Sequence, residues 1–365
     1  MPSPFQLSTM KLFDDTTANP SSNSERIVSG NNRLFMTYSD GKPVNGNQST
    51  TQLQILVSSN DGELIRHTSL PFGFILINII NLNDGTFAVV ASPPYLSNFL
   101  SAFHFDENGN LIAHDSISLP LNSYMGTVSK SHNNNLLVCS YDNSTNGAYL
   151  FESKENGQIL WSKSFSRNWY AIANSNDGGY LLLENGIDSS FSVLKINATG
   201  DSLWSHKYSL PFTSVTYNMV QLGNGTYRIC VNDLDSWGYN PNTPSPLYVY
   251  DINSNGDFLG LKTIFETNYS FSGSIMKLDD THSFSLITVP FNMLGAGRPT
   301  ILSKTNSHFL ILDTSQQITS HGSFQNETTD LIDASCNTSN NQVACFGLMQ
   351  GVGRTYFKPT LFIMQ

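Results

Sequence analysis

The sequence is poor in charged residues. Only 13% of its 365 residues are Asp, Glu, Lys or Arg, about half of the share found in an ordinary soluble domain. The 18 Lys and Arg are outnumbered by 28 Asp and Glu, which gives a formal net charge of −10. Nucleic acids and anionic membranes are bound through basic surfaces, so this balance argues against both as partners.

Long apolar runs and paired metal ligands are missing too. The longest apolar run, residues 72–80, is interrupted by Asn78 and is far shorter than the roughly 20 residues of a membrane-spanning helix. The cysteines form no CxxC pair and no histidine lies at zinc spacing, so we expect no metal site and no cofactor. Residues 1–5 lack the features of a signal peptide, so we expect any export signal to have been removed.

A turn signature recurs along the chain. Its copies begin with a polar residue and end with glycine, at Ser59–Gly62, Asp106–Gly109, Lys154–Gly157, Asn197–Gly200 and Asn253–Gly256, and a degenerate copy ends at Gln316. The pattern is typical of a type I turn closed by a glycine in the left-handed region, which joins two antiparallel strands. Each copy is therefore expected to be the tip of a hairpin.

A second series of seven short turns, rich in Asn, Asp and Gly, lies between these copies. The segments between turns alternate or run apolar, as strands do, for example residues 180–183 and 309–312, and none keeps a helical period. Two hairpin turns in each stretch of about 50 residues predict four antiparallel strands, which is one blade of a β-propeller.

We therefore predict one all-β domain over residues 1–365, a seven-bladed β-propeller of four-stranded antiparallel blades. The N-terminal strand, residues 5–12, would close the last blade beside the C-terminal strand. Six or eight blades remain alternatives, as does a pair of β-sandwiches, which would not repeat one turn signature along the whole chain. The predicted blades are residues 22–70, 71–120, 121–167, 168–211, 212–266, 267–325 and 326–365 together with 5–12.

Two repeats resemble a known group of proteins. One contains Asp177-Gly-Gly-Tyr-Leu-Leu-Leu183 and Gly200-Asp-Ser-Leu-Trp204, and the other contains Gly157-Gln-Ile-Leu-Trp161. They resemble the propellers of exported proteins and lipoproteins of Bacteroidota-type bacteria. Their glycine-to-tryptophan spacing is similar to that of the quinoprotein-dehydrogenase-like propellers.

This resemblance implies the fold and an exported protein, in a periplasm or on a cell surface, with or without a lipid anchor. The chain departs from the quinoprotein group in having no vicinal cysteine pair, so we expect no quinone cofactor. Trp161 and Trp204 are expected to pack between blades.

The long connections of such a fold should share one face, because both turn series are short. Binding residues concentrate on long loops held by a rigid scaffold. In the connection over residues 232–246, aromatic rings lie beside carboxylates and amides, a combination that suits a sugar. The candidate ligand-binding residues of this face are Asp233, Asp235, Trp237, Tyr239, Tyr95, Trp169, Arg298 and Arg354. Packing of the connection onto its blade is the alternative role for each of them.

These features favour a monomeric, non-catalytic binding or scaffold propeller that recognises a glycan or a protein through its long-loop face. The alternative is a carbohydrate-active hydrolase or lyase with acids around a central channel. No pair of acids argues for catalysis, because Asp233 and Asp235 would point to opposite sides of an extended strand. Whether the protein is an enzyme is therefore left open, with the non-catalytic function preferred.

One disulfide is predicted near the C-terminus. Cys336 and Cys345 are equally far from the middle of a turn at Asn340 and Asn341, so a hairpin centred there would place them directly opposite one another. Cysteines in that position can approach disulfide distance. An oxidised pair would support export, whereas thiols would leave the compartment undecided.

Overall fold

The computed structural model describes most of the chain, and every structural statement below refers to these residues. They are residues 7–13, 26–44, 48–71, 73–82, 85–93, 98–120, 123–142, 147–154, 156–167, 169, 171–185, 189–233, 245–267, 272–291, 304–325, 329–337, 342–350 and 357–364.

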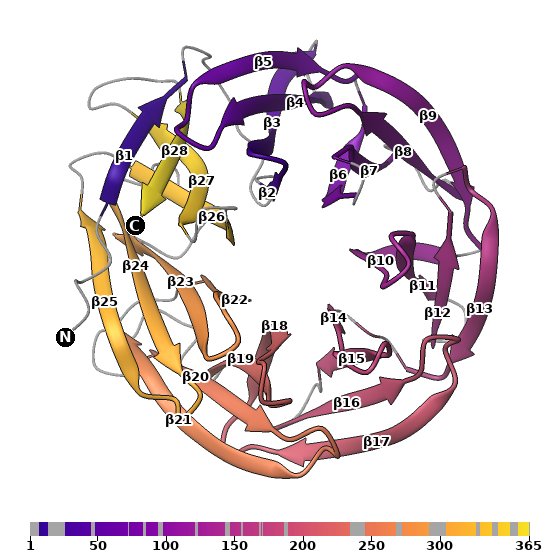
Figure 1. The fold of residues 1–365 in the computed structure, drawn as a ribbon, viewed down its shortest axis with the longest axis vertical. Coiled ribbons are helices and arrows are strands. Elements are labelled where there is room, and N and C mark those ends of the chain that lie inside the picture. The colour runs from indigo at the N-terminus through magenta and orange to yellow at the C-terminus, as the bar shows by residue number, and fades with distance from the viewer. Residues whose placement is uncertain are drawn as a thin grey trace. The chain divides into compact units, whose positions relative to one another are not determined.

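The described residues form strands that are grouped in seven four-stranded antiparallel sheets (Figure 1). The first sheet contains β2 (Arg26–Gly30), β3 (Arg33–Val44), β4 (Gln48–Ser59) and β5 (Leu64–Ser69). The second contains β6 (Ile75–Asn81), β7 (Phe87–Ser92), β8 (Phe99–Phe105) and β9 (Leu111–Ser118). The third contains β10 (Ser123–Lys130), β11 (Leu136–Asp142), β12 (Gly147–Ser153) and β13 (Ile159–Phe165).

The remaining four sheets follow the same order along the chain. The fourth contains β14 (Ala171–Asn174), β15 (Tyr180–Asn185), β16 (Ser190–Ile196) and β17 (Ser202–Ser209). The fifth contains β18 (Ser214–Gln221), β19 (Tyr227–Asp233), β20 (Ser245–Ile252) and β21 (Phe258–Thr267). The sixth contains β22 (Ser272–Lys277), β23 (His282–Phe291), β24 (Lys304–Asp313) and β25 (Ile318–Gln325). The last contains β26 (Thr329–Asn337), β27 (Val343–Gln350), β28 (Phe357–Met364) and β1 (Leu7–Leu12).

The chain divides into two compact units. Unit 1 comprises Met1–Pro4, Ser144–Phe151 and Trp161–Asn326, and unit 2 comprises Phe5–Asn143, Glu152–Leu160 and Glu327–Gln365. Of the described sheets, the fourth, fifth and sixth lie wholly in unit 1, and the first, second and last lie wholly in unit 2.

The prediction of seven blades is corrected by this division. Within the described part of the chain, six blades, not seven, are complete within a unit, three in unit 1 and three in unit 2, because the unit boundary passes through the sheet β10–β13. The turn signature marks the positions of hairpins only, so it could not reveal how the sheets are divided between the units. The division into units depends on packing between residues far apart in the sequence.

How much of a strand is buried depends on its position in the sheet. All seven residues of β16, the third strand of its sheet, are buried, whereas only one of the eight residues of β17, the fourth strand, is buried. A strand that is covered on both faces has no solvent-exposed face, so its sequence need not alternate between apolar and polar residues. Continuous apolar segments such as Leu181–Leu183 on β15 therefore mark inner strands.

The recurring turn signature forms the hairpin tips that the sequence predicts. In the turn between β16 and β17, Gly200 has φ 82° and its N–H donates to the carbonyl of Asn197 at 3.1 Å. The Asn197 side-chain oxygen accepts from the N–H groups of Thr199 and Asp201 at 3.0 and 2.9 Å. A polar first residue and a glycine in fourth place are needed because the side chain caps the turn while the backbone enters the left-handed region.

The two repeat tryptophans pack on the turns of the following sheets, as the resemblance implies. A Cβ atom added to Gly200 would lie 2.6 Å from Cζ3 of Trp161, and one added to Gly256 would lie 3.1 Å from Cζ3 of Trp204. Trp204 also donates from Nε1 to the carbonyl of Ser254 at 3.3 Å. Each turn glycine thus leaves room for a ring of the preceding sheet.

The degenerate turn copy reverses this arrangement. Its last residue is Gln316, with φ 61°, and the residue that it meets on β21 is Gly260. The Gln316 side chain donates from Nε2 to the carbonyl of Gly260 at 3.3 Å. Where the strand has no side chain, the turn supplies one, so the contact between the two sheets is kept.

The N-terminal segment supplies the fourth strand of the last sheet. β1 pairs antiparallel with β28, with the register running from Leu7 opposite Met364 to Leu12 opposite Thr360. Both strands belong to unit 2. The outer edge of β28 is therefore covered by residues from the other end of the chain, which removes an open sheet edge.

The predicted pairing of Cys336 with Cys345 is wrong. In the hairpin of β26 and β27, Cys336 lies opposite Ala344, and Cys345 lies opposite Ser335. The hairpin is centred half a residue earlier than the Asn340–Asn341 turn would place it, and this shifts the pairs from Ala334 to Asn337 by one position. Cys345, like Cys139 and Cys230, is a buried thiol outside any disulfide, so these cysteines leave the compartment undecided.

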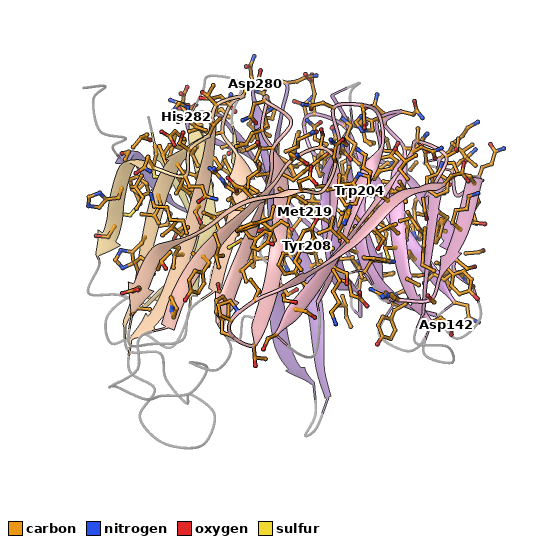
Figure 2. The ribbon with its side chains drawn as sticks, turned by 90° about the horizontal axis from the view of Figure 1, so that it is seen from below. Asp142, Trp204, Tyr208, Met219, Asp280 and His282 are labelled. Atoms are coloured by element: carbon orange, nitrogen blue, oxygen red, sulfur yellow. The ribbon has the colours of Figure 1, made fainter. Side chains whose placement is uncertain are left out.

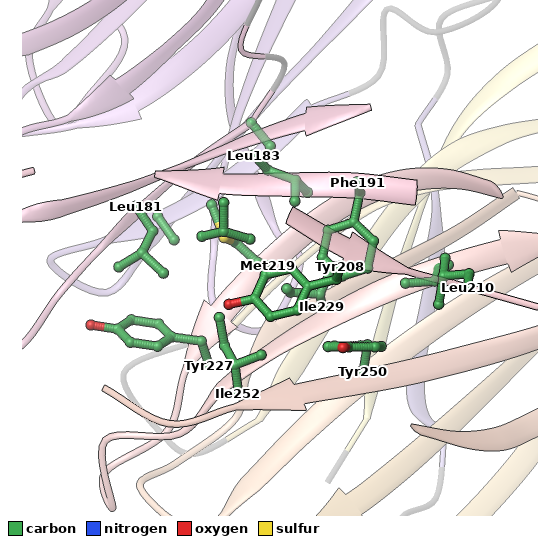
Figure 3. Close-up of a cluster of buried hydrophobic side chains, with 14 of the residues drawn as sticks. Leu181, Leu183, Phe191, Tyr208, Leu210, Met219, Tyr227, Ile229, Tyr250 and Ile252 are labelled. Carbon is green, nitrogen blue, oxygen red and sulfur yellow. The ribbon is translucent and has the colours of Figure 1, made fainter. Parts of the chain in front are cut away.

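The largest apolar cluster described in unit 1 joins its fourth and fifth sheets (Figure 3). Phe191, Tyr208 and Tyr250 meet at its centre, with ring centroids 5.0 to 5.4 Å apart. The Tyr208 hydroxyl donates to the carbonyl of Gly256 at 2.7 Å. Burial of these rings raises the pKa of Tyr250 to about 12. The cluster therefore packs two blades of unit 1 against one another.

Candidate functional site

Each sheet has two different ends. The turn end carries the short turns between the first and second strands and between the third and fourth strands. In unit 1 the labelled residues Asp280 and His282 lie at this end (Figure 2). The loop end is the opposite end of each sheet, where in unit 1 the strands β15, β19 and β23 finish and β16, β20 and β24 begin.

The structure describes two of the eight predicted site residues. Asp233 is the last residue of β19 and lies opposite Ser214 at the loop end of its sheet. Trp169 precedes β14 and is only 4% exposed, with its ring edge-on to Phe165 at 6.4 Å. Tyr95, Asp235, Trp237, Tyr239, Arg298 and Arg354 lie outside the described residues.

A buried cationic cluster occupies the turn end of unit 1. The Lys195 side chain is 2% exposed, and its Nζ donates to Asp177 Oδ1 at 2.7 Å and to the Tyr227 hydroxyl at 3.2 Å. That hydroxyl also shares a hydrogen bond with Ser175. Tyr227 belongs to β19 and Lys195 to β16, so the cluster links the fourth sheet to the fifth.

A second buried cluster links the fifth sheet to the sixth. Arg228 is fully buried and donates from Nε and Nη2 to the two carboxylate oxygens of Asp251 at 2.9 and 2.8 Å. Its Nη1 donates to Ser283 and to the carbonyl of Asp313 at 3.0 and 2.8 Å. Every nitrogen of this guanidinium is therefore used inside the protein, which makes the cluster a structural clamp.

The Asp177–Lys195 pair should make stability depend on acid pH. Partial desolvation raises the pKa of Asp177, but hydrogen bonds from Lys195, Gly179 and Ser175 outweigh it and lower that pKa to about 2. A carboxylate whose pKa falls on folding stabilises the protein above its unfolded pKa, near 3.8, and loses this effect as the pH falls towards 2.

We therefore expect Asp177→Asn to cost about 1 kcal/mol at pH 6, a figure reduced because the Asp177 side chain is mostly exposed. Urea unfolding of both proteins between pH 6 and pH 2 measures the difference. The difference in the free energy of unfolding between the two proteins should disappear as the pH falls below 4. A gap that stays constant over this range would show that Asp177 acts through something other than its charge.

The loop end of unit 1 carries a different, half-exposed cluster. Arg167 follows β13, and its Nη1 donates to Glu184 Oε2 at 3.1 Å and to the Ser192 hydroxyl at 2.9 Å. Glu184 on β15 and Ser192 on β16 are directly opposite in the register. The Arg167 side chain is 49% exposed and that of Glu184 is 20% exposed. The two strands thus hold one nitrogen of the guanidinium while much of it faces solvent.

This cluster can both donate and accept hydrogen bonds. Among the described residues, Nε and Nη2 of Arg167 make no hydrogen bond, so three N–H groups are available for a ligand. Glu184 adds carboxylate lone pairs, and the ion pair as a whole carries no net charge. A neutral set of fixed donors and acceptors suits the hydroxyl groups of a sugar better than a single charged group does.

Sequence reasoning named Trp169 but missed Arg167 and Glu184. Arg167 lies two residues before Trp169 in the same connection, so an arginine beside aromatic residues was the available signal. Glu184 gave no signal, because it lies at the end of an apolar strand and meets Arg167 only through the pairing of β15 with β16.

Neither a metal cluster nor a membrane-spanning helix appears in the described part of the chain. No group of three or more His, Cys, Asp or Glu residues there could hold a metal ion. No helix there is long and apolar enough to cross a membrane.

Comparison with known proteins places the chain by fold alone. No protein-family model matches it, and no curated protein matches it in sequence. Solved structures do match. The β-propeller domain of the Trilobed protease from Pyrococcus furiosus is 11% identical, with a TM-score of 0.54 over 97% of this chain and 95% of that one.

Two other solved structures cover 99% of this chain. A fungal alcohol oxidase of the AA5 family, in complex with copper, is 10% identical, with a TM-score of 0.57 over 76% of that chain. BBS1N, in complex with ARL6DN, is also 10% identical, with a TM-score of 0.56 over 97% of that chain. At these identities the comparisons support an all-β propeller of four-stranded antiparallel blades and say nothing of activity.

Proposed function

We propose that this protein is a non-catalytic β-propeller that binds a glycan at the loop end of unit 1. The observation that carries the proposal is the Arg167–Glu184–Ser192 cluster, which presents three N–H donors and a carboxylate from a rigid sheet. A preformed polar set on a packed scaffold loses little freedom when a ligand binds.

The predicted aromatic residues complete the proposed site. A sugar ring needs an apolar surface to stack on as well as partners for its hydroxyl groups. Trp169 does not offer an open face in this structure, because it is buried against Phe165. We therefore assign the stacking role to Trp237 or Tyr239, in the connection between β19 and β20.

Recognition of a protein instead of a glycan remains the nearest alternative, because arginine is also enriched at protein interfaces. A hydrolase or lyase is a further alternative, but Glu184 is held in an ion pair with Arg167, which suits a hydrogen-bond acceptor better than a proton donor. Export to a periplasm or a cell surface belongs to the proposal and rests on the resemblance of the repeats.

A glycan array followed by calorimetric titration tests the proposal. We expect Arg167→Ala to weaken binding of the best glycan by about tenfold to a hundredfold, because a charge-assisted hydrogen bond is lost. The melting temperature should change little, because an exposed ion pair contributes little to stability. Trp237→Ala should weaken binding likewise.

Lys163→Ala is the matched control, since Lys163 forms an exposed ion pair with Asp201 at a turn end. It should leave the affinity unchanged. If the parent protein bound no glycan on the array, or if Arg167→Ala and Lys163→Ala bound it equally well, the glycan site would be refuted and a protein partner would become the better reading.

A further inference from the structure

The first sheet of unit 2 contains an unusually long hairpin. β3 and β4 pair without a register shift from Arg33 opposite Ser59 to Val44 opposite Gln48. β2 pairs with β3 only up to Thr37, and β5 pairs with β4 only down to Gln54. Beyond those points neither outer edge of the hairpin, drawn in purple in Figure 2, pairs with a described strand.

The direction of the backbone groups along β4 follows from one hydrogen bond. The carbonyl of Leu53 accepts from the N–H of Leu70, just after β5, so Leu53 points its polar groups away from β3. In an antiparallel strand the N–H and C=O of one residue point to the same side, and the side alternates along the strand. The backbone N–H and C=O groups of Ser49 and Thr51 therefore also point away from β3, whereas those of Thr50 and Gln52 point towards β3.

The proline on β3 agrees with this assignment. Pro43 lies opposite Ser49, and the alternation makes it an outward-pointing residue of the other edge. Proline has no N–H, so it is tolerated on an edge strand where its nitrogen faces away from the ladder. The outer edge of β3 therefore lacks one backbone N–H donor for a pairing strand. The outer edge of β4 keeps the backbone N–H groups of Ser49 and Thr51.

We propose that the β4 edge over Gln48–Gln52 pairs with the same edge of a second copy of this chain. Residues 48–52 read Gln-Ser-Thr-Thr-Gln, which is uncharged and nearly palindromic. A two-fold axis at Thr50 places Ser49 opposite Thr51 of the other copy, so outward-pointing residues meet outward-pointing residues. The two copies then form four main-chain hydrogen bonds.

A second copy fits this edge better than an unrelated strand does. The pairing puts Gln opposite Gln and Thr opposite Thr, and no charge lies opposite a like charge, which would oppose the pairing. The stretch ends at Gln52, because Leu70 already occupies the carbonyl of Leu53. So short an edge buries far less surface than a stable dimer needs, and the association should be weak and reversible.

Disulfide trapping tests the proposal with a matched control. The symmetric pairing places Thr50 opposite Thr50 of the other copy, within the range in which two cysteines can be bridged. Thr50→Cys protein, oxidised in air with copper phenanthroline, should form a disulfide-linked dimer about tenfold faster than Lys42→Cys protein. Lys42 lies opposite Thr50 on β3, so its cysteine occupies the same level of the other edge.

A second comparison tests the hydrogen bonds. Thr51→Pro, added to Thr50→Cys, removes an outward N–H and should slow dimer formation about tenfold. Gly41→Pro, added instead, alters the opposite edge and should leave the rate unchanged. Melting curves confirm that each variant is folded. Equal trapping rates for Thr50→Cys and Lys42→Cys, or a rate that Thr51→Pro leaves unchanged in folded protein, would overturn the pairing.

Discussion

Replacing Gly200 with alanine should lower the free energy of unfolding by about 2–5 kcal/mol. The new Cβ would lie 2.6 Å from Cζ3 of Trp161 and 2.8 Å from Cγ of Lys163, and the residue has φ 82°. Left-handed backbone costs an alanine roughly 1–2 kcal/mol, and forced overpacking typically adds about 1–3 kcal/mol. Urea unfolding followed by circular dichroism measures the loss.

Gly178 offers a matched control for this prediction. It has φ 85° and lies in a turn of the same sheet, but a Cβ added there would meet no atom within 4 Å. Gly178→Ala should therefore cost only the backbone term, roughly 1–2 kcal/mol. Removing the ring as well, in Trp161→Ala with Gly200→Ala, should show less loss than the two single changes added together. Additive losses would mean that Trp161 and Gly200 do not dock.

Replacing Arg228 with methionine should cost about 3–5 kcal/mol, because it leaves the buried carboxylate of Asp251 without its partner. Arg228 is fully buried and the Asp251 side chain is 4% exposed. The change also removes the bonds to Ser283 and to the carbonyl of Asp313. The loss can be measured by urea unfolding at neutral pH.

Two comparisons show whether the buried charge is the cause. Arg228→Met combined with Asp251→Leu should recover part of the loss, because an apolar pair can replace a buried ion pair. Lys277→Ala breaks an exposed ion pair with Asp280 and should cost no more than about 1 kcal/mol. If the double variant were less stable than Arg228→Met alone, an unpaired carboxylate could not explain the effect.

The turns and strands could be predicted because they depend on neighbouring residues. The Asn197–Gly200 turn needs a side chain that caps it and a glycine that enters the left-handed region, and both are visible in four consecutive residues. The tryptophan contacts were visible as well, because Gly157–Trp161 and Gly200–Trp204 repeat one spacing. Local chemistry of this kind needs no knowledge of the rest of the chain.

The cysteine hairpin shows where such reasoning stops. Centring the turn half a residue differently moves Cys336 from Cys345 to Ala344, and no residue of the turn distinguishes the two registers. Packing of the strand faces selects one of them, because a slip by one residue exchanges the buried face for the exposed face.

The sequence by itself determined the all-β class, the hairpins and the four-stranded blades, because turn chemistry and apolar periodicity act over a few residues. Tertiary structure decided the division into two units, the register of β26 and β27, and the meeting of Arg167 with Glu184. These features depend on residues brought together by packing from distant parts of the chain. Their free energies come from burial and shape, which a single stretch of sequence does not contain.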